Sequence, residues 1–315
     1  MSEMLAVALT LSASAGSRAI DAGVTENARA LLSGYDIIAD RELAPGIAHE
    51  IIFVAPEQTD LPALRRTIGK QLVDSAIDIN IIFNDVAFTR RKLLVADMES
   101  TIIEQEMLDE LGDYVGRRAE IEEVTARAMR GELDFEAAIK ARVGLLRGLP
   151  ESVLEEVKCR ITFMPGAVAL IATMKANGAY CALVSGGFTV FTADVAERLG
   201  FDEHRANVIE VAGGKLTGLV REPILGREAK RERLVTLTQE LGLLPAQTLA
   251  VGDGANDLDM LGAAGLGVAF RAKPKVREAA AALVNGAVVS CGDLTALLYL
   301  QGYRAVEFAG TGGKS

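Results

Sequence analysis

The first 85 residues alternate between apolar runs of strand type and amphipathic stretches of helical period. Apolar, β-branched runs of about four to eight residues indicate strands, and apolar positions spaced three and four apart indicate helices. The pattern predicts strands over 4–11, 36–43, 48–55 and 77–83 and helices over 26–35 and 61–75. This βαββαβ order is typical of an α+β ferredoxin-like sandwich. We therefore expect residues 1–85 to form a separate N-terminal domain.

Residues 86–305 show a different alternation, in which short apolar runs follow longer helical stretches. The predicted strands cover 93–96, 180–184, 248–252 and 267–270. Strands that alternate with helices indicate an α/β fold with a doubly wound, parallel, Rossmann-like sheet. Two insertions interrupt it. Residues from about 102 to 161 are helical throughout and predict a cap over the sheet, and residues 207–220, with Gly213-Gly214 at their centre, predict a β-hairpin flap.

Each end of the chain contains a stretch that partly resembles a known motif. The apolar stretch 5–16 follows Glu3 without any Lys or Arg, which favours a first strand over a secretory leader. Residues 306–315 predict a flexible tail. Their final GGKS resembles part of a phosphate-binding loop, but Phe308 stands where that motif requires its first glycine.

Composition narrows the possible partners and the compartment. The chain has 315 residues, half of them hydrophobic, and a net charge of -10, which argues against a nucleic-acid or membrane-surface partner. No apolar run approaches the roughly 18 residues that a membrane span needs. The cysteines Cys159, Cys181 and Cys291 are odd in number and form no C-x-x-C pair. Reduced thiols of this kind are typical of cytoplasmic proteins.

Three predicted strands of the second domain end in a polar residue. Asp97 follows the strand 93–96, Ser185 follows 180–184, and Asp253 follows 248–252. The carboxyl ends of such strands line the ligand crevice of an open α/β sheet, so we expect the three side chains to lie together. A buried carboxylate needs a cationic partner. Asp97 is therefore a metal ligand, a nucleophile or both.

The residues around these strand ends favour phosphate and magnesium chemistry. Ser185-Gly186-Gly187 would let backbone N–H groups approach an anion at the start of the next helix. Asp253 and Asp257 are about one helical turn apart, and their oxygens suit Mg²⁺ better than zinc. Lys230, within the charged run 227–233, taken alone is typical of a solvated helix face.

Together these blocks resemble the motifs of the haloacid dehalogenase-like phosphatases over residues 92–300, in particular of the members that act on phosphoserine. The N-terminal domain resembles the ACT-like domain of longer bacterial members. The resemblance implies that Asp97 is the nucleophile and a Mg²⁺ ligand. It implies Asp253 as a second ligand and the backbone carbonyl of Glu99 as a third.

The same resemblance assigns the phosphoryl group and its surroundings. Ser185 and Gly186 would bind the phosphoryl group, and Lys230 would neutralise it. Asn256 and Asp257 would hold the site and the metal-bound waters without ligating the metal directly.

Glu99 departs from the family, which usually has Asp two residues after the nucleophile. The resemblance makes Glu99 the proton donor and base, with one additional methylene in its side chain. The backbone carbonyl is the same for either residue, so metal binding should not change. A misplaced acid should slow the reaction by no more than the roughly 10²- to 10⁴-fold that proton transfer contributes.

The cap carries the expected substrate specificity. Phe135 and Arg142 fall on one apolar stripe of the predicted helix 134–146. Arg142 could extend to solvent, or it could bind a carboxylate in fork geometry. The resemblance implies Glu106 as the acid that receives an ammonium group, although it could also be an ordinary exposed acid, and Met129 and Phe135 as apolar contacts. Arg142 and Glu106 together would select phosphoserine over a sugar phosphate.

The sequence thus predicts a Mg²⁺-dependent phosphatase that hydrolyses phosphoserine through an aspartyl phosphate, the last step of serine biosynthesis. Two alternatives stay open. One is a phosphatase for another small amine-bearing phosphomonoester, such as phosphohomoserine. The other is a catalytically impaired sensor of a phosphorylated ligand, in which the ACT-like domain transmits the signal. That domain could form a homodimer contact or bind an amino acid.

Overall fold

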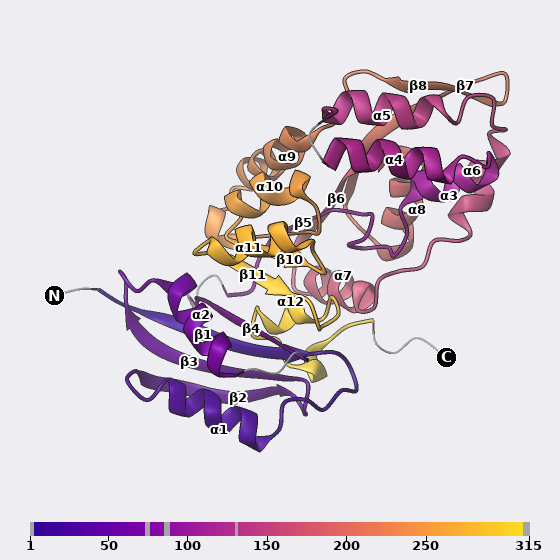
Figure 1. Ribbon diagram of the computed structural model, residues 1–315. Helices are drawn as coiled ribbons and strands as arrows, with labels where there is room; N and C mark the ends of the chain where they lie inside the picture. Colours follow the sequence, from indigo (N-terminus) through magenta and orange to yellow (C-terminus); the bar gives the residue numbers. More distant parts are fainter. Residues whose placement is uncertain (1–2, 73–75, 85–88, 130–131, 311–315) are drawn as a thin grey trace.

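The computed structural model describes residues 3–72, 76–84, 89–129 and 132–310, and the strands in these ranges form two sheets (Figure 1). The first sheet is antiparallel, with the order β2-β3-β1-β4. The predicted βαββαβ order is confirmed by β1 (Met4–Ala13), α1 (Ala22–Leu31), β2 (Asp36–Ala44), β3 (Ala48–Pro56), α2 (Leu61–Gln71) and β4 (Ile77–Phe83).

Alternation along β1 gives the first sheet two different faces. Val7, Leu9 and Leu11 are buried with residues of α1 and α2, which cover one face. Ala8 and the polar residues between these positions point to the opposite face, which packs against α12 (Ala296–Tyr299). A strand with period-two burial separates its side chains in this way.

The second sheet has the order β11-β10-β9-β5-β6-β7-β8, and all its pairs are parallel except β7 with β8. Its strands are β5 (Leu93–Ala96), β6 (Tyr180–Phe188), β7 (Glu203–Ala212), β8 (Lys215–Arg221), β9 (Thr248–Gly252), β10 (Leu266–Phe270) and β11 (Gly286–Val289). Helices α7 (Ala167–Ala176) and α8 (Thr189–Leu199) cover one face, and α9 (Arg227–Glu240), α10 (Leu258–Ala263) and α11 (Pro274–Ala282) cover the other. This is the predicted doubly wound sheet.

Helices on both faces explain why the central strands read as unbroken apolar runs. Leu94 and Ala96 of β5 belong to the core with α7 and α8, and Leu93 and Val95 belong to the core with α9 and α10. Both faces of a parallel strand are therefore dry, and every position along it is apolar.

The predicted cap and hairpin are both present, and they are joined. The cap contains α3 (Met107–Tyr114), α4 (Arg118–Met129), α5 (Phe135–Gly144) and α6 (Ser152–Lys158). Gly148 N donates to Leu216 O at 2.9 Å, and Leu216 N donates to Leu149 O at 2.9 Å. These bonds attach the end of α5 to the β7–β8 hairpin, at the end of the molecule opposite the N-terminal domain (Figure 1).

The two sheets are connected by side-chain amide and carboxylate bonds rather than by a continuous ladder. Asn80 of β4 is fully buried; its Nδ2 donates to Val288 O at 2.9 Å, and its Oδ1 accepts from Val288 N at 2.8 Å. Asp78 accepts from the N–H groups of Ser290, Cys291 and Gly292. Both side chains thereby provide hydrogen-bond partners for backbone groups of β11 or of the loop after it.

The chain end differs from the prediction of a flexible tail over 306–315. Ala305–Glu307 form a 3₁₀ turn, the ring of Phe308 lies 5.2 Å from that of Tyr299, and Ala309 N donates to Thr173 Oγ1 at 2.8 Å. The apolar Phe308 is what brings this segment onto the protein. Residues 311–315 lie outside the described ranges. Among the described residues, no helix has the length and apolar character needed to cross a bilayer.

Candidate active site

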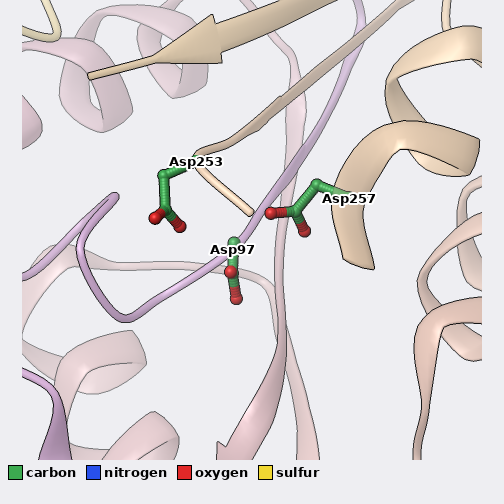
Figure 2. A group of neighbouring side chains, drawn as sticks. All are labelled: Asp97, Asp253 and Asp257. Atoms are coloured by element: carbon green, nitrogen blue, oxygen red, sulfur yellow. The ribbon is translucent and has the colours of Figure 1, made fainter. Parts of the chain in front are cut away.

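Three aspartates meet at the carboxyl edge of the second sheet. Asp97 follows β5 directly, Asp253 follows β9, and Asp257 ends the short 3₁₀ turn Ala255–Asp257. One carboxylate oxygen from each lies within 4.8 Å of the others (Figure 2). The structure therefore brings together the strand-end residues Asp97 and Asp253, together with Asp257.

Backbone contacts fix the position of Asp97. Its N–H continues the β5–β9 pairing by donating to Val251 O at 3.0 Å, and its Oδ1 accepts from Met98 N at 2.8 Å. Gly252, at the end of β9, makes room for the neighbouring carboxylate, because a Cβ there would lie 2.3 Å from Asp257 Cγ. A glycine is thus required where strand and carboxylate approach so closely.

Lys230 of α9 is the cation that faces these carboxylates. Its Nζ lies 2.7 Å from Asp97 Oδ1 and 2.6 Å from Asp257 Oδ1, and the residue is only 2% exposed. Considered alone, the charged run 227–233 predicts a solvent-exposed helix face, and for Lys230 this prediction is wrong. Leu234 and Leu237 are buried on the same side of α9, four and seven residues later. That helical spacing is the signal in the sequence.

The charges in this cluster do not balance. Burial raises the pKa of Asp97 to about 7; Lys230 partly offsets this effect, and the charges of Asp257 and Asp253 add to it. Burial and the charge of Asp257 raise the pKa of Asp253 to about 6. Burial lowers the pKa of Lys230, but Asp257 and Asp97 outweigh it and raise the pKa overall. Three carboxylates against one ammonium group leave an excess of negative charge.

Mg²⁺ fits this donor set. Carboxylate oxygens are its preferred protein ligands, and a divalent cation would balance the excess negative charge. Asp257 already uses both oxygens within the protein, since Oδ1 contacts Lys230 and Oδ2 accepts from Gly254 N at 2.9 Å. This agrees with a role for Asp257 beside the metal rather than as a direct ligand.

Ser185 lies on β6, the strand that pairs with β5, and not at the start of a helix. Strand β6 runs on to Phe188, and α8 begins only at Thr189. We expected the N–H groups of Gly186 and Gly187 at the start of the next helix, but both glycines lie in the extended segment that precedes α8. Ser185 is buried, and its Oγ accepts from Gly187 N at 2.9 Å.

The Glu99 side chain contacts the start of the cap and has a raised pKa. Its Oε1 accepts from Met107 N, the first residue of α3, at 3.0 Å. Burial, followed by the negative charges of Glu106 and Asp97, raises the pKa of Glu99 to about 8. A carboxyl group with a pKa in this range is suited to proton transfer near neutral pH. Gly187 allows this proximity, since a Cβ there would lie 3.1 Å from Glu99 Oε1.

Two charged cap residues face the same region. Glu106, just before α3, accepts a hydrogen bond from Ser100 Oγ at 2.7 Å, and its charge raises the pKa of both Glu99 and Asp253. Arg142 of α5 donates through Nε to Ala138 O at 3.3 Å, and its charge lowers the pKa of Glu99. Glu106 and Arg142 thus both stand within electrostatic range of Glu99, and Glu106 also of Asp253.

The predicted apolar cap contacts are only partly described. The Phe135 ring covers Gly186, where a Cβ would lie 3.1 Å from Phe135 Cζ, and it reaches Gly226, where a Cβ would lie 3.6 Å from Cδ1. The side chain of Met129 lies outside the described part of the structure. The Asn256 amide folds back over Gly254, 2.2 Å from where a Cβ would lie.

Sequence reasoning missed Ser100 and Lys273. Ser100 adopts a positive φ of 55° and bonds Glu106, and the charge of Lys273 lowers the pKa of Asp253. Ser100 lies just after the end of β5, and this position indicated that its side chain would lie at the edge of the site. Lys273 follows β10, which runs parallel to β9, so its place after a strand end was also a signal.

A family model described as haloacid dehalogenase-like hydrolase matches residues 94–262. A phosphoserine phosphatase of Streptomyces coelicolor is 43% identical over 244 residues, 78% of this chain and 58% of that protein. A phosphoserine phosphatase of Polaromonas sp. is 42% identical over 219 residues, 68% of this chain and 93% of that protein. The chain thus spans less than two thirds of the first relative and nearly all of the second. An unliganded crystal structure of a probable phosphoserine phosphatase from Vibrio cholerae matches 96% of this chain and 88% of its own, at 32% identity and a TM-score of 0.73.

Metal binding can be tested through stability. We expect saturating Mg²⁺ to raise the melting temperature of the protein, since about 100-fold excess over the dissociation constant adds about 2.7 kcal/mol. Asp253→Asn should abolish this response. Because the raised pKa of Asp253 means that its ionised form is unfavourable in the folded protein, the same change should raise the melting temperature of the metal-free protein at pH 8.

The control is Asp259→Asn, which removes a nearby carboxylate that pairs with Arg227 instead. Its response to Mg²⁺ should match that of the unchanged protein, as followed by differential scanning calorimetry. A full Mg²⁺ response in Asp253→Asn would contradict the assignment.

Proposed function

Because the chain belongs to the haloacid dehalogenase-like hydrolase family, we propose that it is a Mg²⁺-dependent phosphoserine phosphatase, which hydrolyses O-phospho-L-serine to L-serine and phosphate. The observation that carries the proposal is the buried contact of Asp97 with Lys230 at 2.7 Å, beside Asp253 and Asp257 at the same sheet edge. The relatives named above support the same substrate. We place the reaction in the cytoplasm, as the last step of serine biosynthesis.

In the first step, a carboxylate oxygen of Asp97 attacks phosphorus. The new bond to Asp97 forms as the bond from phosphorus to the serine oxygen breaks, and Glu99 gives its proton to that oxygen. The products are serine and an aspartyl phosphate. Lys230 and Ser185 hold the phosphoryl oxygens, because both side chains can donate hydrogen bonds into the space beside Asp97.

In the second step, Glu99 acts as the base. It takes a proton from water, the resulting hydroxide attacks phosphorus, and the bond from phosphorus to Asp97 breaks to release phosphate. Mg²⁺ held by Asp97, Asp253 and the Glu99 backbone carbonyl would neutralise the phosphoryl oxygens. Glu99 is again protonated at the end of the cycle, ready for the next substrate.

The cap supports an amino-acid substrate rather than a sugar phosphate. Glu106 supplies a negative charge for an ammonium group, and Arg142 supplies donors in a planar fork for a carboxylate. Both influence the pKa of Glu99, the group that must reach the leaving oxygen. Phe135, over Gly186, closes the apolar side of the site.

The activity itself is the first test. We expect the protein to release phosphate from phosphoserine when Mg²⁺ is present and to stop when EDTA removes the metal. Asp97→Asn should abolish turnover, because the amide cannot form the aspartyl phosphate. Asp259→Asn is the matched control and should turn over normally. An absence of phosphate release by the unchanged protein with Mg²⁺ would favour the alternative of a phospho-ligand sensor.

Changes at Glu99 test the proton-transfer step. Glu99→Gln should lower kcat by about 10²- to 10⁴-fold, since an amide cannot transfer the proton. Glu99→Asp shortens the side chain and should keep the reaction while losing the bond from Met107 N. The measurement is steady-state kcat with phosphoserine. A gain above about 10⁴-fold in Glu99→Asp would mean that Glu99 does not work as the acid.

Changes at Arg142 test carboxylate recognition. Arg142→Ala should lower kcat/KM for phosphoserine by about 10- to 100-fold, the effect of losing a charged hydrogen bond of about 1.5–3 kcal/mol. Phosphoethanolamine lacks the carboxylate, so its turnover should not change. Lys140→Ala is the control on the same helix, since Lys140 is exposed and bonds Glu222 at 2.8 Å. Equal losses on both substrates would contradict carboxylate binding by Arg142.

A further inference from the structure

The segment of β6 that contains Ser185, proposed above to bind the phosphoryl group, departs from regular pairing with β7 beside Asn207. Val184 pairs with Arg205, and the next pair is Phe188 with Asn207. Strand β6 therefore advances four residues, from 184 to 188, while β7 advances two, from 205 to 207. An irregularity of this kind leaves backbone groups without a strand partner. Ser185, Gly186 and Gly187 all lie inside it.

The side chain of Asn207 fills this gap. It is 2% exposed, and its Nδ2 donates to Gly186 O at 2.9 Å. Its Oδ1 accepts from Leu225 N at 2.7 Å. Leu225 immediately precedes Gly226, the residue before α9, and α9 carries Lys230. One buried amide thus joins the two segments that supply Ser185 and Lys230.

The orientation of one peptide carries this effect to Ser185. The carbonyl of Gly186 and the N–H of Gly187 belong to the same planar peptide and point in opposite directions. With the carbonyl held by Asn207, the N–H of Gly187 points to Ser185 Oγ and donates to it at 2.9 Å. The Ser185 oxygen is then an acceptor from the backbone, which leaves its hydroxyl hydrogen to donate elsewhere.

We propose that Asn207 is a positioning residue for phosphoryl binding. It sets the Gly186–Gly187 peptide so that Ser185 presents its hydroxyl hydrogen to a phosphoryl oxygen, and it holds the entry to α9 in register with that strand. The inference rests on the proposed function, in which Ser185 and Lys230 hold the phosphoryl group. Asn207 itself does not touch the substrate.

This positioning role requires an amide side chain at position 207. Position 207 must donate to a carbonyl and accept from an N–H at the same time, which an asparagine side chain can do. An aspartate would keep the acceptor for Leu225 N but place a second oxygen against Gly186 O. Repulsion between the two oxygens would rotate the Gly186–Gly187 peptide. The Gly187 N–H would then no longer donate to Ser185 Oγ.

Asn207→Asp is the primary variant, and Asn80→Asp is its matched control. Asn80 is also buried on a strand and makes the same pair of bonds with its amide, to Val288 O and Val288 N. Both changes should lower the melting temperature. Below both melting temperatures, Asn207→Asp should reduce kcat/KM for phosphoserine by about 10- to 100-fold, as expected for a displaced positioning contact. Asn80→Asp should leave kcat/KM unchanged.

A double-mutant cycle with Ser185→Ala separates positioning from general loss of structure. If Asn207 acts through Ser185, then Asn207→Asp should have a smaller effect in the Ser185→Ala background than in the unchanged protein. Should Asn207→Asp fail to fold, Asn207→Ala replaces it, since that change adds no charge. The inference is overturned if the reductions in kcat/KM caused by Asn207→Asp and Ser185→Ala multiply fully in the double variant. It is also overturned if Asn80→Asp and Asn207→Asp reduce kcat/KM by the same factor.

Binding of inorganic phosphate distinguishes this inference from the proposed function. Calorimetric titration with phosphate in the presence of Mg²⁺ should show weaker binding for Asn207→Asp and unchanged binding for Asn80→Asp. If the unchanged protein binds phosphate but does not turn over phosphoserine, the proposed substrate is wrong while the role of Asn207 stands on the binding result. Equal phosphate affinity in Asn207→Asp and the unchanged protein would overturn the inference even if phosphoserine is hydrolysed.

Discussion

The contact of Lys230 with Asp97 and Asp257 is the interaction around which the second domain is arranged. Removing a charged group from water carries a penalty of several kcal/mol, which a close partner must offset. Lys230 is nearly inaccessible to solvent and finds two carboxylates within 2.7 Å. The pair of carboxylates outweighs the single ammonium group, and Asp253 adds to the excess. This excess of negative charge supports the proposed binding of a divalent cation.

Parallel strands explain why these groups meet. Strands β5, β6 and β9 are neighbours that run in the same direction, so the residues at their carboxyl ends come to one edge. Their apolar bodies are buried on both faces and hold the edge rigid. Close approach then depends on small residues, because Gly252 admits the Asp257 carboxylate and Gly187 admits Glu99. Buried strands and the absence of side chains at these glycines together allow the carboxylates to approach one another closely.

Asparagine side chains join backbones at two places where the ladders end. Asn80 connects the first sheet to β11, and Asn207 connects the interrupted part of β6 to the entry of α9. An amide can do this because it copies the donor and acceptor of a peptide group. At Asn80 the result is attachment of the N-terminal domain. At Asn207 the same chemistry lies next to the groups proposed to hold phosphate.

The apolar pattern alone predicts the alternation of elements and places Asp97, Ser185 and Asp253 at strand ends. A buried parallel strand requires an apolar run, and these polar residues stand where each run ends. The same pattern did not predict which carboxylates Lys230 contacts, the continuation of β6 through Gly187, the packing of Phe308, or the bonds of Asn207. Each of these depends on a partner distant along the chain. These contacts are set by the folding of distant segments against one another. Local composition does not indicate which carboxylate, carbonyl or ring a given side chain will contact.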